Sequence, residues 1–259
     1  LRELYQLPEG YQVVLGNGGS TVFWDVAICS LIERRSAHAV FGEFTRKFAR
    51  AAEAAPFLAG PDITECAPGA VVLPVPEDAD VVAWAQNETS TGAAAPVERI
   101  GDGLVLIDAT SAAGGMAADI SRTDVYYFAP QKNFSSDGGL WVAFCSPAAL
   151  ERAERIAAAG RWIPESLNLG VAASNSARNQ TLNTPAIATL LLLEDQINWL
   201  LGLGGIEAAE ERCRRMSGHL YGWAETSSYA TPFVTNPAHR SPVVATIDLA
   251  PGVDATRVI

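Results

Sequence analysis

The chain has 259 residues, of which 49% are hydrophobic and 18% are charged. This composition excludes a disordered chain and is ample for one large domain, or for a large domain with part of a second. The formal net charge of −11 disfavours a nucleic-acid partner, and no apolar run reaches the roughly 18 residues that a membrane-spanning helix needs. We therefore expect a chain that binds neither nucleic acid nor membrane.

Cysteine and histidine are sparse and scattered. The four cysteines (Cys29, Cys66, Cys145 and Cys213) lie far apart, with no Cys-x-x-Cys pair among them. We therefore expect no metal site, and reduced thiols in a cytoplasmic protein are the simplest interpretation.

Short apolar runs alternate with helical patterns along the chain. The runs predict strands at residues 12–15, 37–41, 70–74, 81–85, 104–108, 125–128 and 140–144, and helices at 20–34, 44–55, 147–159, 185–201 and 206–225. Several strands are apolar on both faces, as strands of a covered parallel sheet must be. The pattern predicts an α/β fold with a mainly parallel seven-stranded sheet flanked by helices.

The pattern changes near residue 229, where two strand-like runs follow at 231–235 and 243–249. We expect a large domain over residues 1–228 and the incomplete beginning of a smaller α/β domain over 229–259. Because the chain starts without methionine in a segment that already leads to a strand, we expect it to be part of a longer protein.

Residues 16–21, Gly-Asn-Gly-Gly-Ser-Thr, stand between a predicted strand and a predicted helix. Glycines let backbone amides approach an anion, and the amino end of a helix adds the positive end of its dipole. The segment is therefore a candidate phosphate cradle, although a tight strand–helix turn explains it equally well. Thr21 stands where the third glycine of a Gly-x-Gly-x-x-Gly motif belongs, so a dinucleotide site is the weaker alternative.

Asp108 ends the apolar strand predicted at 104–108. Ligands of parallel sheets bind at the carboxyl ends of the strands, and a carboxylate there can pair with a cationic ring nitrogen. Considered alone, a cap on the loop through Thr110 and Ser111 is the simpler explanation.

Lys132 follows the strand predicted at 125–128. The chain contains 16 arginines but only two lysines, Lys47 and Lys132, so a lysine is expected to do what arginine cannot, such as lose its proton and attack a carbonyl. Partial burial would favour the neutral, nucleophilic amine, whereas the alternative is a solvated loop lysine. An anion cradle, a strand-end carboxylate and a strand-end lysine are together the three parts that a pyridoxal 5′-phosphate (PLP) site needs.

Several segments resemble the phosphoserine aminotransferase family, especially its actinobacterial form. They comprise residues 16–24, 84–92, 105–115, 124–140 and 179–185, so the resemblance extends over essentially the whole chain. The most specific parts are Asn-Glu-Thr at 87–89, the lysine motif at 130–133 and Asn-Thr-Pro at 183–185. The resemblance implies a fold-type-I, class V enzyme that binds PLP and works as a homodimer with shared active sites.

The resemblance also implies roles for single residues. Lys132 would hold PLP as a Schiff base and move the proton between the substrate Cα and the cofactor C4′. Asp108 would pair with the pyridine nitrogen and keep it protonated. Phe44 occupies the place of an aromatic side chain stacked on the ring, where other branches have tryptophan, and Thr89 would contact the polar edge of the cofactor.

The family's phosphate contacts fall on Gly18, Gly19, Ser20 and Gln131. A solvent-exposed loop position is the simpler explanation for Gln131.

Asn183 and Thr184 would reach the phosphate of the cofactor in the partner subunit, according to the resemblance. Ordinary capping at the start of the helix predicted at 185–201 is the simpler explanation for both residues. Likewise, Phe44 could belong to the core face of its helix, and Thr89 could cap a turn.

The implied reaction transfers the amino group between O-phospho-L-serine and 2-oxoglutarate, giving 3-phosphooxypyruvate and glutamate, in serine biosynthesis with a side role in pyridoxine biosynthesis. The family's substrate-reading residues are expected upstream of residue 1 and downstream of residue 259. Arg240 is expected at the surface, and Arg161 near the mouth of the site.

Other class V activities remain alternatives, namely a serine–glyoxylate transaminase or a desulfurase, although no cysteine lies in an obvious flexible glycine-rich loop. A PLP-binding or dimerisation fragment without turnover is the non-enzymatic alternative.

Overall fold

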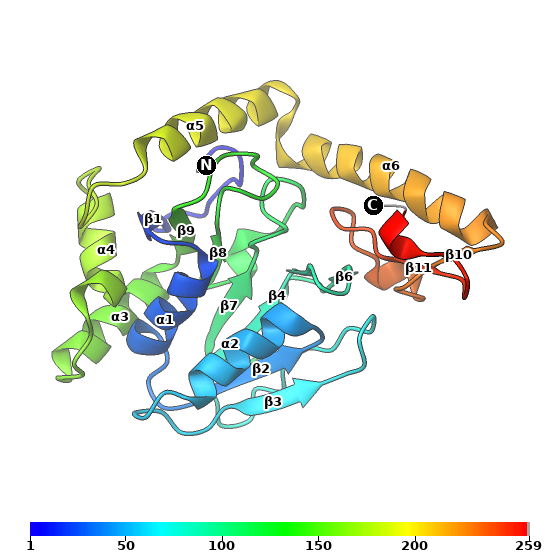
Figure 1. Cartoon of the computed structure of the whole chain (residues 1–259). Coiled ribbons are helices and arrows are strands. Elements are labelled where there is room, and N and C mark those ends of the chain that lie inside the picture. Colours follow the sequence, from blue (N-terminus) through cyan, green and yellow to red (C-terminus); the bar gives the residue numbers. More distant parts are fainter. Residues whose placement is uncertain (258–259) are drawn as a thin grey trace.

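A seven-stranded sheet forms the centre of the computed structural model, which describes residues 1–257 (Figure 1). The strand order is β1-β9-β8-β7-β4-β2-β3. The strands are β1 (Gln12–Asn17), β2 (Ser36–Val40), β3 (Asp62–Glu65), β4 (Val81–Ala85), β7 (Leu104–Asp108), β8 (Val125–Phe128) and β9 (Leu140–Cys145).

Only β9 runs against the other strands. It pairs antiparallel with both β8 and β1, whereas the pairs among β8, β7, β4, β2 and β3 are all parallel. The carboxyl ends of the other six strands therefore meet at one side of the sheet, which we call the carboxyl edge. The predicted mainly parallel seven-stranded α/β fold is thus confirmed.

Helices cover both faces of the sheet (Figure 1). The first face packs against α1 (Ser20–Ser30), α2 (Glu43–Glu53), α3 (Pro147–Ala158) and α4 (Leu169–Ser176). The second face packs against the N-terminal segment around Tyr5 and against α5 (Ile187–Gly202) and α6 (Gly205–Thr226). This double cover is why β4 and β8 are buried along their whole length.

One predicted strand is wrong. Residues 70–74 form no strand; Val71, Val72 and Leu73 instead pack against the core as an irregular segment. The seventh strand is β3, whose alternating polar residues suit an exposed sheet edge, with Ile63 itself exposed. The apolar run was mistaken for a strand because burial, rather than strand pairing, accounts for its composition.

The helices differ most from prediction in three places. The first helix ends at Ser30 rather than at residue 34, and α5 begins at Ile187 with Ala186 as its N-cap, so Thr184 and Pro185 do not start it. Helix α4, which packs along β1, was not predicted. The helix predicted at 147–159 ends close to where it was expected, because Ala159 is its C-cap and Gly160, with φ of +86°, follows directly.

Two small antiparallel sheets lie outside the central one. The strands β5 (Asn87–Glu88) and β6 (Ala93–Ala94) form a tight turn after β4, and β10 (Ala230–Pro232) pairs with β11 (Ile247–Leu249). The second pair occupies part of the two predicted strand-like runs and lies apart from the central sheet in Figure 1.

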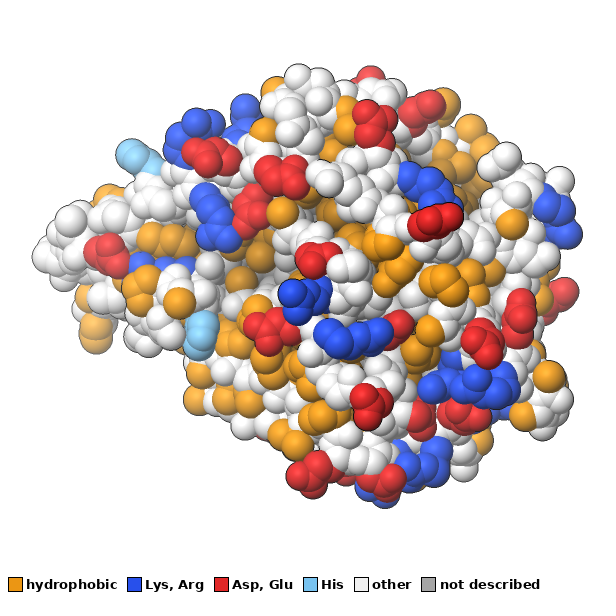
Figure 2. All heavy atoms as spheres, turned by 180° about the vertical axis from the view of Figure 1, so that it is seen from behind, with side chains coloured by type: hydrophobic (Ala, Val, Ile, Leu, Met, Phe, Trp, Pro, Cys, Tyr) orange, Lys and Arg blue, Asp and Glu red, His pale blue; other side chains and the backbone are white. Residues whose placement is uncertain are grey.

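The surface mixes charges of both signs. Seen from behind, acidic and basic side chains are interspersed (Figure 2), and several arginines pair with carboxylates, as Arg46 does with Glu65. Among residues 1–257, no helix is both long and apolar enough to cross a membrane.

Candidate active site

Asp108 lies at the carboxyl end of β7 and is bonded by neutral donors only. Its Oδ2 accepts hydrogen bonds from Trp24 Nε1 at 3.1 Å and from the Tyr127 hydroxyl at 3.0 Å, and its Oδ1 accepts from the Thr110 amide at 2.9 Å. None of the ion pairs within residues 1–257 includes it. Withdrawal from water raises the pKa of the Asp108 carboxyl, and the three donors only partly oppose that rise. A cationic group at this position would therefore stabilise the ionised carboxylate.

The predicted cradle lies beside Asp108, at the amino end of α1. Gly18 has φ of +119°, and a Cβ there would lie 2.7 Å from Val22 Cγ2, so this position requires glycine. The Gly18 amide donates to Gly139 O at 2.9 Å, so its contribution to the cradle is conformational. The amides of Gly19, Ser20 and Thr21 have no acceptor among the described residues, and a Cβ on Gly19 would meet no atom within 4 Å. This helix end is therefore open to an anion.

Ser20 joins the cradle to the loop after β7, because its hydroxyl accepts a hydrogen bond from Thr110 Oγ1 at 2.6 Å. Thr110 thus links the cradle to Asp108, because its amide donates to Asp108 and its hydroxyl donates to Ser20, although 90 positions separate Ser20 from Thr110.

Lys132 lies in the loop that leaves β8 and returns along β9. Its neighbours fix this loop: Asn133 Nδ2 donates to Ser111 O at 2.8 Å, and the buried Phe134 ring stacks on Phe128 with centroids 5.1 Å apart. The Lys132 side chain is exposed, so the predicted partial burial is absent from the single chain. A fixed backbone with a free amine suits a residue that must meet a ligand.

The Asn-Glu-Thr triplet faces the same loop after β7. Asn87 Nδ2 and Thr89 Oγ1 both bond to Ser111 Oγ, at 2.8 and 2.7 Å. Asn87 Oδ1 is buried with no hydrogen-bond partner among the described residues. Thr89 therefore lies one hydrogen bond from the loop that begins at Asp108.

Phe44 is the second residue of α2, and 40% of its surface is exposed, so it does not belong to the core face of that helix. The face that packs into the core carries Phe48, Ala49 and Ala52 instead. Gln131 precedes Lys132 and is exposed, with no side-chain hydrogen bond to the described residues.

Comparison with known proteins identifies the family. The Aminotransferase class-V family model matches residues 72–258 of the chain. The chain belongs to the class V aminotransferases. Its relatives include the phosphoserine aminotransferase of Nocardioides sp., 56% identical over 264 residues that cover all of this chain and 71% of that protein. A protein of Mycolicibacterium vanbaalenii, provisionally named a phosphoserine aminotransferase, is also 56% identical, over 262 residues with the same coverage.

The fold of this class V aminotransferase is also that of solved relatives. A crystal structure of a phosphoserine aminotransferase from Cytophaga hutchinsonii superposes with a TM-score of 0.87 at 25% identity and covers 93% of this chain and 69% of that one. The predicted family and fold class are therefore both confirmed.

Asn183 and Thr184 lie in the segment before α5 of this class V chain, and both are exposed. Their side chains do not cap α5, whose N-cap is Ala186 and has no side-chain cap. Asn17 Nδ2, at the end of β1, instead holds the segment through Thr184 O at 3.1 Å. The two side chains therefore remain free at the β1 side of the carboxyl edge.

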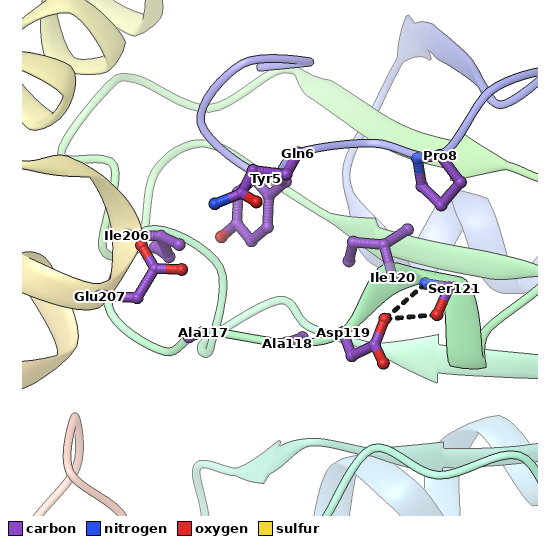
Figure 3. A pocket seen from close by; sticks show the side chains of 10 residues that line it. All are labelled: Tyr5, Gln6, Pro8, Ala117, Ala118, Asp119, Ile120, Ser121, Ile206 and Glu207. Carbon is purple, nitrogen blue, oxygen red and sulfur yellow. Dashed lines mark hydrogen bonds between the residues drawn. The ribbon is translucent and has the colours of Figure 1, made fainter.

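Two cavities of this class V chain lie away from Lys132 and Asp108, neither of which lines them. A cavity of about 490 Å³ is lined by Tyr5, Ile120, Ile206 and Glu207, among others, and includes no predicted site residue (Figure 3). A second, of about 760 Å³, lies between β1 and α5 and includes Thr184. Lys132 instead stands at an open surface.

Two arginines of the class V chain are structural. Arg161 donates to the carbonyls of Cys29, Ile32 and Glu33 at the carboxyl end of α1, so it is far from the mouth of the site. Arg240 is not a free surface residue, because its guanidinium pairs with Glu225 and lies over the Tyr221 ring.

Sequence reasoning missed the residues that surround Asp108. Trp24 and Tyr127 bond to Asp108, yet neither was assigned a role. The cap on the loop through Thr110 that the sequence suggested for Asp108 is present, because Asp108 Oδ1 accepts from the Thr110 amide. Tyr127 lies between Tyr126 and Phe128 in a fully buried strand, so its hydroxyl was the one sign of a polar partner.

Proposed function

We propose that this class V aminotransferase transfers the amino group between O-phospho-L-serine and 2-oxoglutarate, giving 3-phosphooxypyruvate and glutamate with PLP as cofactor. The proposal extends to this chain the activity in the names of relatives 56% identical to it. The observation that carries it is the arrangement at the carboxyl edge. Lys132 follows β8, Asp108 ends the neighbouring strand β7, and a helix amino end with free amides lies beside Asp108.

The described residues fit the three chemical parts of PLP. The open amino end of α1, formed by Gly18, Gly19 and Ser20, suits its phosphate. The Asp108 carboxylate, bonded only by neutral donors, suits a protonated ring nitrogen. The exposed Lys132 amine suits its aldehyde carbon, and we assign Phe44 to the ring face, Thr89 to its polar edge and Gln131 to the phosphate.

The chemistry divides between cofactor and chain. When bound, PLP supplies an electron sink for the charge that develops at the substrate Cα. Lys132 would bind the cofactor and then move a proton to and from that Cα. Asp108 would hold the proton on the ring nitrogen, and its bonds to Trp24 and Tyr127 would keep the carboxylate oriented.

A homodimer completes this proposal. The exposed side chains of Asn183 and Thr184 would contact the cofactor phosphate in a second copy, and each site would then be shared. We also propose that residues 1–228 form the large domain and residues 229–259 begin a smaller one. We further propose that the protein is cytoplasmic.

The first prediction concerns Lys132. Addition of PLP followed by borohydride reduction and peptide mass mapping should place a phosphopyridoxyl group on Lys132, because reduction fixes the imine that its amine forms. The assignment is unambiguous, since Lys47 is the only other lysine. Lys47→Arg should label as the wild type does, and Lys132→Arg should not label.

Labelling of Lys47 or of the amino terminus alone would overturn the assignment. Protein that binds PLP at Lys132 should form glutamate from phosphoserine and 2-oxoglutarate. Glutamate from 2-oxoglutarate with serine but not with phosphoserine would overturn the substrate while leaving the cofactor in place. A sulfur-transfer activity is disfavoured, because Cys29, Cys66 and Cys213 are only partly exposed and burial raises the pKa of each thiol.

A further inference from the structure

The amino end of α2, which carries Phe44, is capped by another part of the chain. Its N-cap residue is Gly42, which has no side chain to accept a hydrogen bond from the first turn. The Glu43 amide donates instead to Ser90 Oγ at 2.9 Å. The amides of Phe44 and Thr45 donate to the two carboxylate oxygens of Glu88, at 3.4 and 2.9 Å. Glu88 and Ser90, in the turn at β5, therefore supply the cap that fixes the start of α2.

Glu88 is a buried carboxylate without a basic partner. Its side chain is 0% exposed, and no ion pair within residues 1–257 includes it. Its remaining donors are the Ser90 amide and hydroxyl, at 3.1 and 2.7 Å, and the Thr45 hydroxyl at 3.0 Å. The amides at the positive end of α2 and these three donors therefore compensate the buried carboxylate, which ties it to the helix end.

Glu88 packs closely against the helix end, with no room for a side chain at Gly42. A Cβ at Gly42 would lie 2.2 Å from Glu88 Cγ and 2.4 Å from its Cδ. The Thr45 hydroxyl also accepts from the Gly42 amide at 3.1 Å, which closes the junction from the other side.

The two neighbours of Glu88 point to the opposite side of the same turn. Side chains alternate along a strand, and Asn87 and Thr89 both bond to Ser111 in the loop after Asp108, as described above. The Asn-Glu-Thr triplet thus connects the site loop on one side with the helix of Phe44 on the other.

We infer that Glu88 is a positioning residue, which sets Phe44 against the cofactor ring by fixing the amino end of α2. It acts through Phe44 rather than by touching substrate or cofactor. The inference rests on the proposed function, because only a bound ring gives Phe44 its role.

A double-mutant cycle tests the inference. PLP affinity, measured by absorbance titration, is compared among the wild type, Glu88→Gln, Phe44→Ala and the double variant. Glu88→Gln keeps the shape of the side chain but removes its charge and one acceptor, so we expect about tenfold weaker binding when Phe44 is present. In the Phe44→Ala background the same change should alter affinity by less than about twofold. Glu43→Gln, which removes an exposed carboxylate from the same helix end, is the matched control and should leave affinity unchanged.

A second readout needs no cofactor. Amide hydrogen exchange at Phe44 and Thr45 should accelerate in cofactor-free Glu88→Gln, while β7 and β8 keep wild-type protection. Equal losses of affinity with and without Phe44, or unchanged exchange at these two amides, would overturn the inference.

Misfolding of Glu88→Gln and failure of the proposed function can each be distinguished from failure of the inference. If Glu88→Gln does not fold, Ser90→Ala decides, because it removes the exposed acceptor of the Glu43 amide and should weaken affinity only when Phe44 is present. If wild-type protein takes no PLP at Lys132, the proposed function fails, whereas the exchange result still tests whether Glu88 fixes the helix end.

Discussion

Asp108 is destabilising for the ligand-free chain, and this follows from its surroundings. Because burial raises the folded-state pKa of its carboxyl, Asp108 contributes stability below its unfolded pKa and loses that contribution as the pH rises through the folded pKa. At neutral pH this carboxyl therefore opposes folding until a cation pairs with it. A stability deficit of this kind is common at sites that bind charged ligands.

Asp108→Asn should separate stability from activity. At pH 7 the cofactor-free variant should unfold at the same or higher denaturant concentration than the wild type, because the cost of withdrawing an ionisable carboxyl from water is gone. Transamination should fall by about a hundredfold or more, the usual effect of removing one preorganised charge. Chemical denaturation and steady-state rates measure the two effects. Asp102→Asn, in the exposed loop before β7, is the control; lower stability in Asp108→Asn would contradict the argument.

At the residue scale, the sequence located groups at strand ends but could not reveal their partners. Asp108 and Lys132 stood out because each follows an apolar run. Trp24 is 84 positions from Asp108, and only the folding of α1 across the sheet brings its indole N–H to the carboxylate. The exposure of Lys132 was also unpredictable, because it depends on what surrounds the loop rather than on the loop itself.

At the scale of elements, the β5–β6 turn joins the site to the C-terminal part of the chain. Gly92 has φ of +68°, and its carbonyl accepts from the Ser241 amide at 2.9 Å. The Thr246 hydroxyl donates to Thr91 O at 2.7 Å. This turn therefore carries contacts to α2, to the loop after β7 and to residues 241–246.

Gly92→Ala should loosen that junction. A Cβ at this position would lie 2.6 Å from Thr246 Oγ1 and 2.9 Å from Val244 O, in a backbone region that alanine disfavours. We expect a loss of about 1–3 kcal/mol in the free energy of unfolding. In contrast, Gly60→Ala, where a Cβ meets no atom within 4 Å, should change it by less than about 0.5 kcal/mol. Urea denaturation distinguishes the two, and equal effects would contradict the steric argument.

The same scale explains which elements the sequence predicted. Strands such as β4 and β7 are buried on both faces, and that requirement is visible as an uninterrupted apolar run. Edge strand β3 need not be apolar on both faces, so its polar residues Asp62 and Thr64 break the apolar run by which a strand is recognised in the sequence. Helix α4 is short, and its helical stability comes from packing on β1, which is tertiary information.

At the scale of the whole molecule, acid should weaken the fold before its carboxylates titrate. His38 is buried in β2, where its Nε2 pairs with Ser36 Oγ at 3.0 Å and its ring meets the edge of Phe48. Burial lowers the pKa of His38 to about 4. The unfolded chain therefore binds the extra proton first, and stability falls as the pH drops from about 6.5 to about 4.

Between pH 7 and pH 5 this single group should reduce the free energy of unfolding by about 2 kcal/mol. Denaturation series at several pH values measure the loss. This loss of stability should be absent from His38→Gln and should be unchanged in His219→Gln, which alters an exposed histidine. Equal pH dependence in all three proteins would rule out His38 as the source.

The reversed direction of β9 has a consequence for when the lysine can move. Both stems of its loop, β8 and β9, are fully buried strands inside the sheet, so neither can open without breaking the pairs on its far side. Local fluctuations that loosen loops and helix ends leave such strands closed until the molecule unfolds globally. The proposed point of cofactor attachment, Lys132, is thus tied to the slowest-opening part of the protein. Heat or denaturant should therefore separate its amine from the other proposed site residues only when the entire sheet is lost.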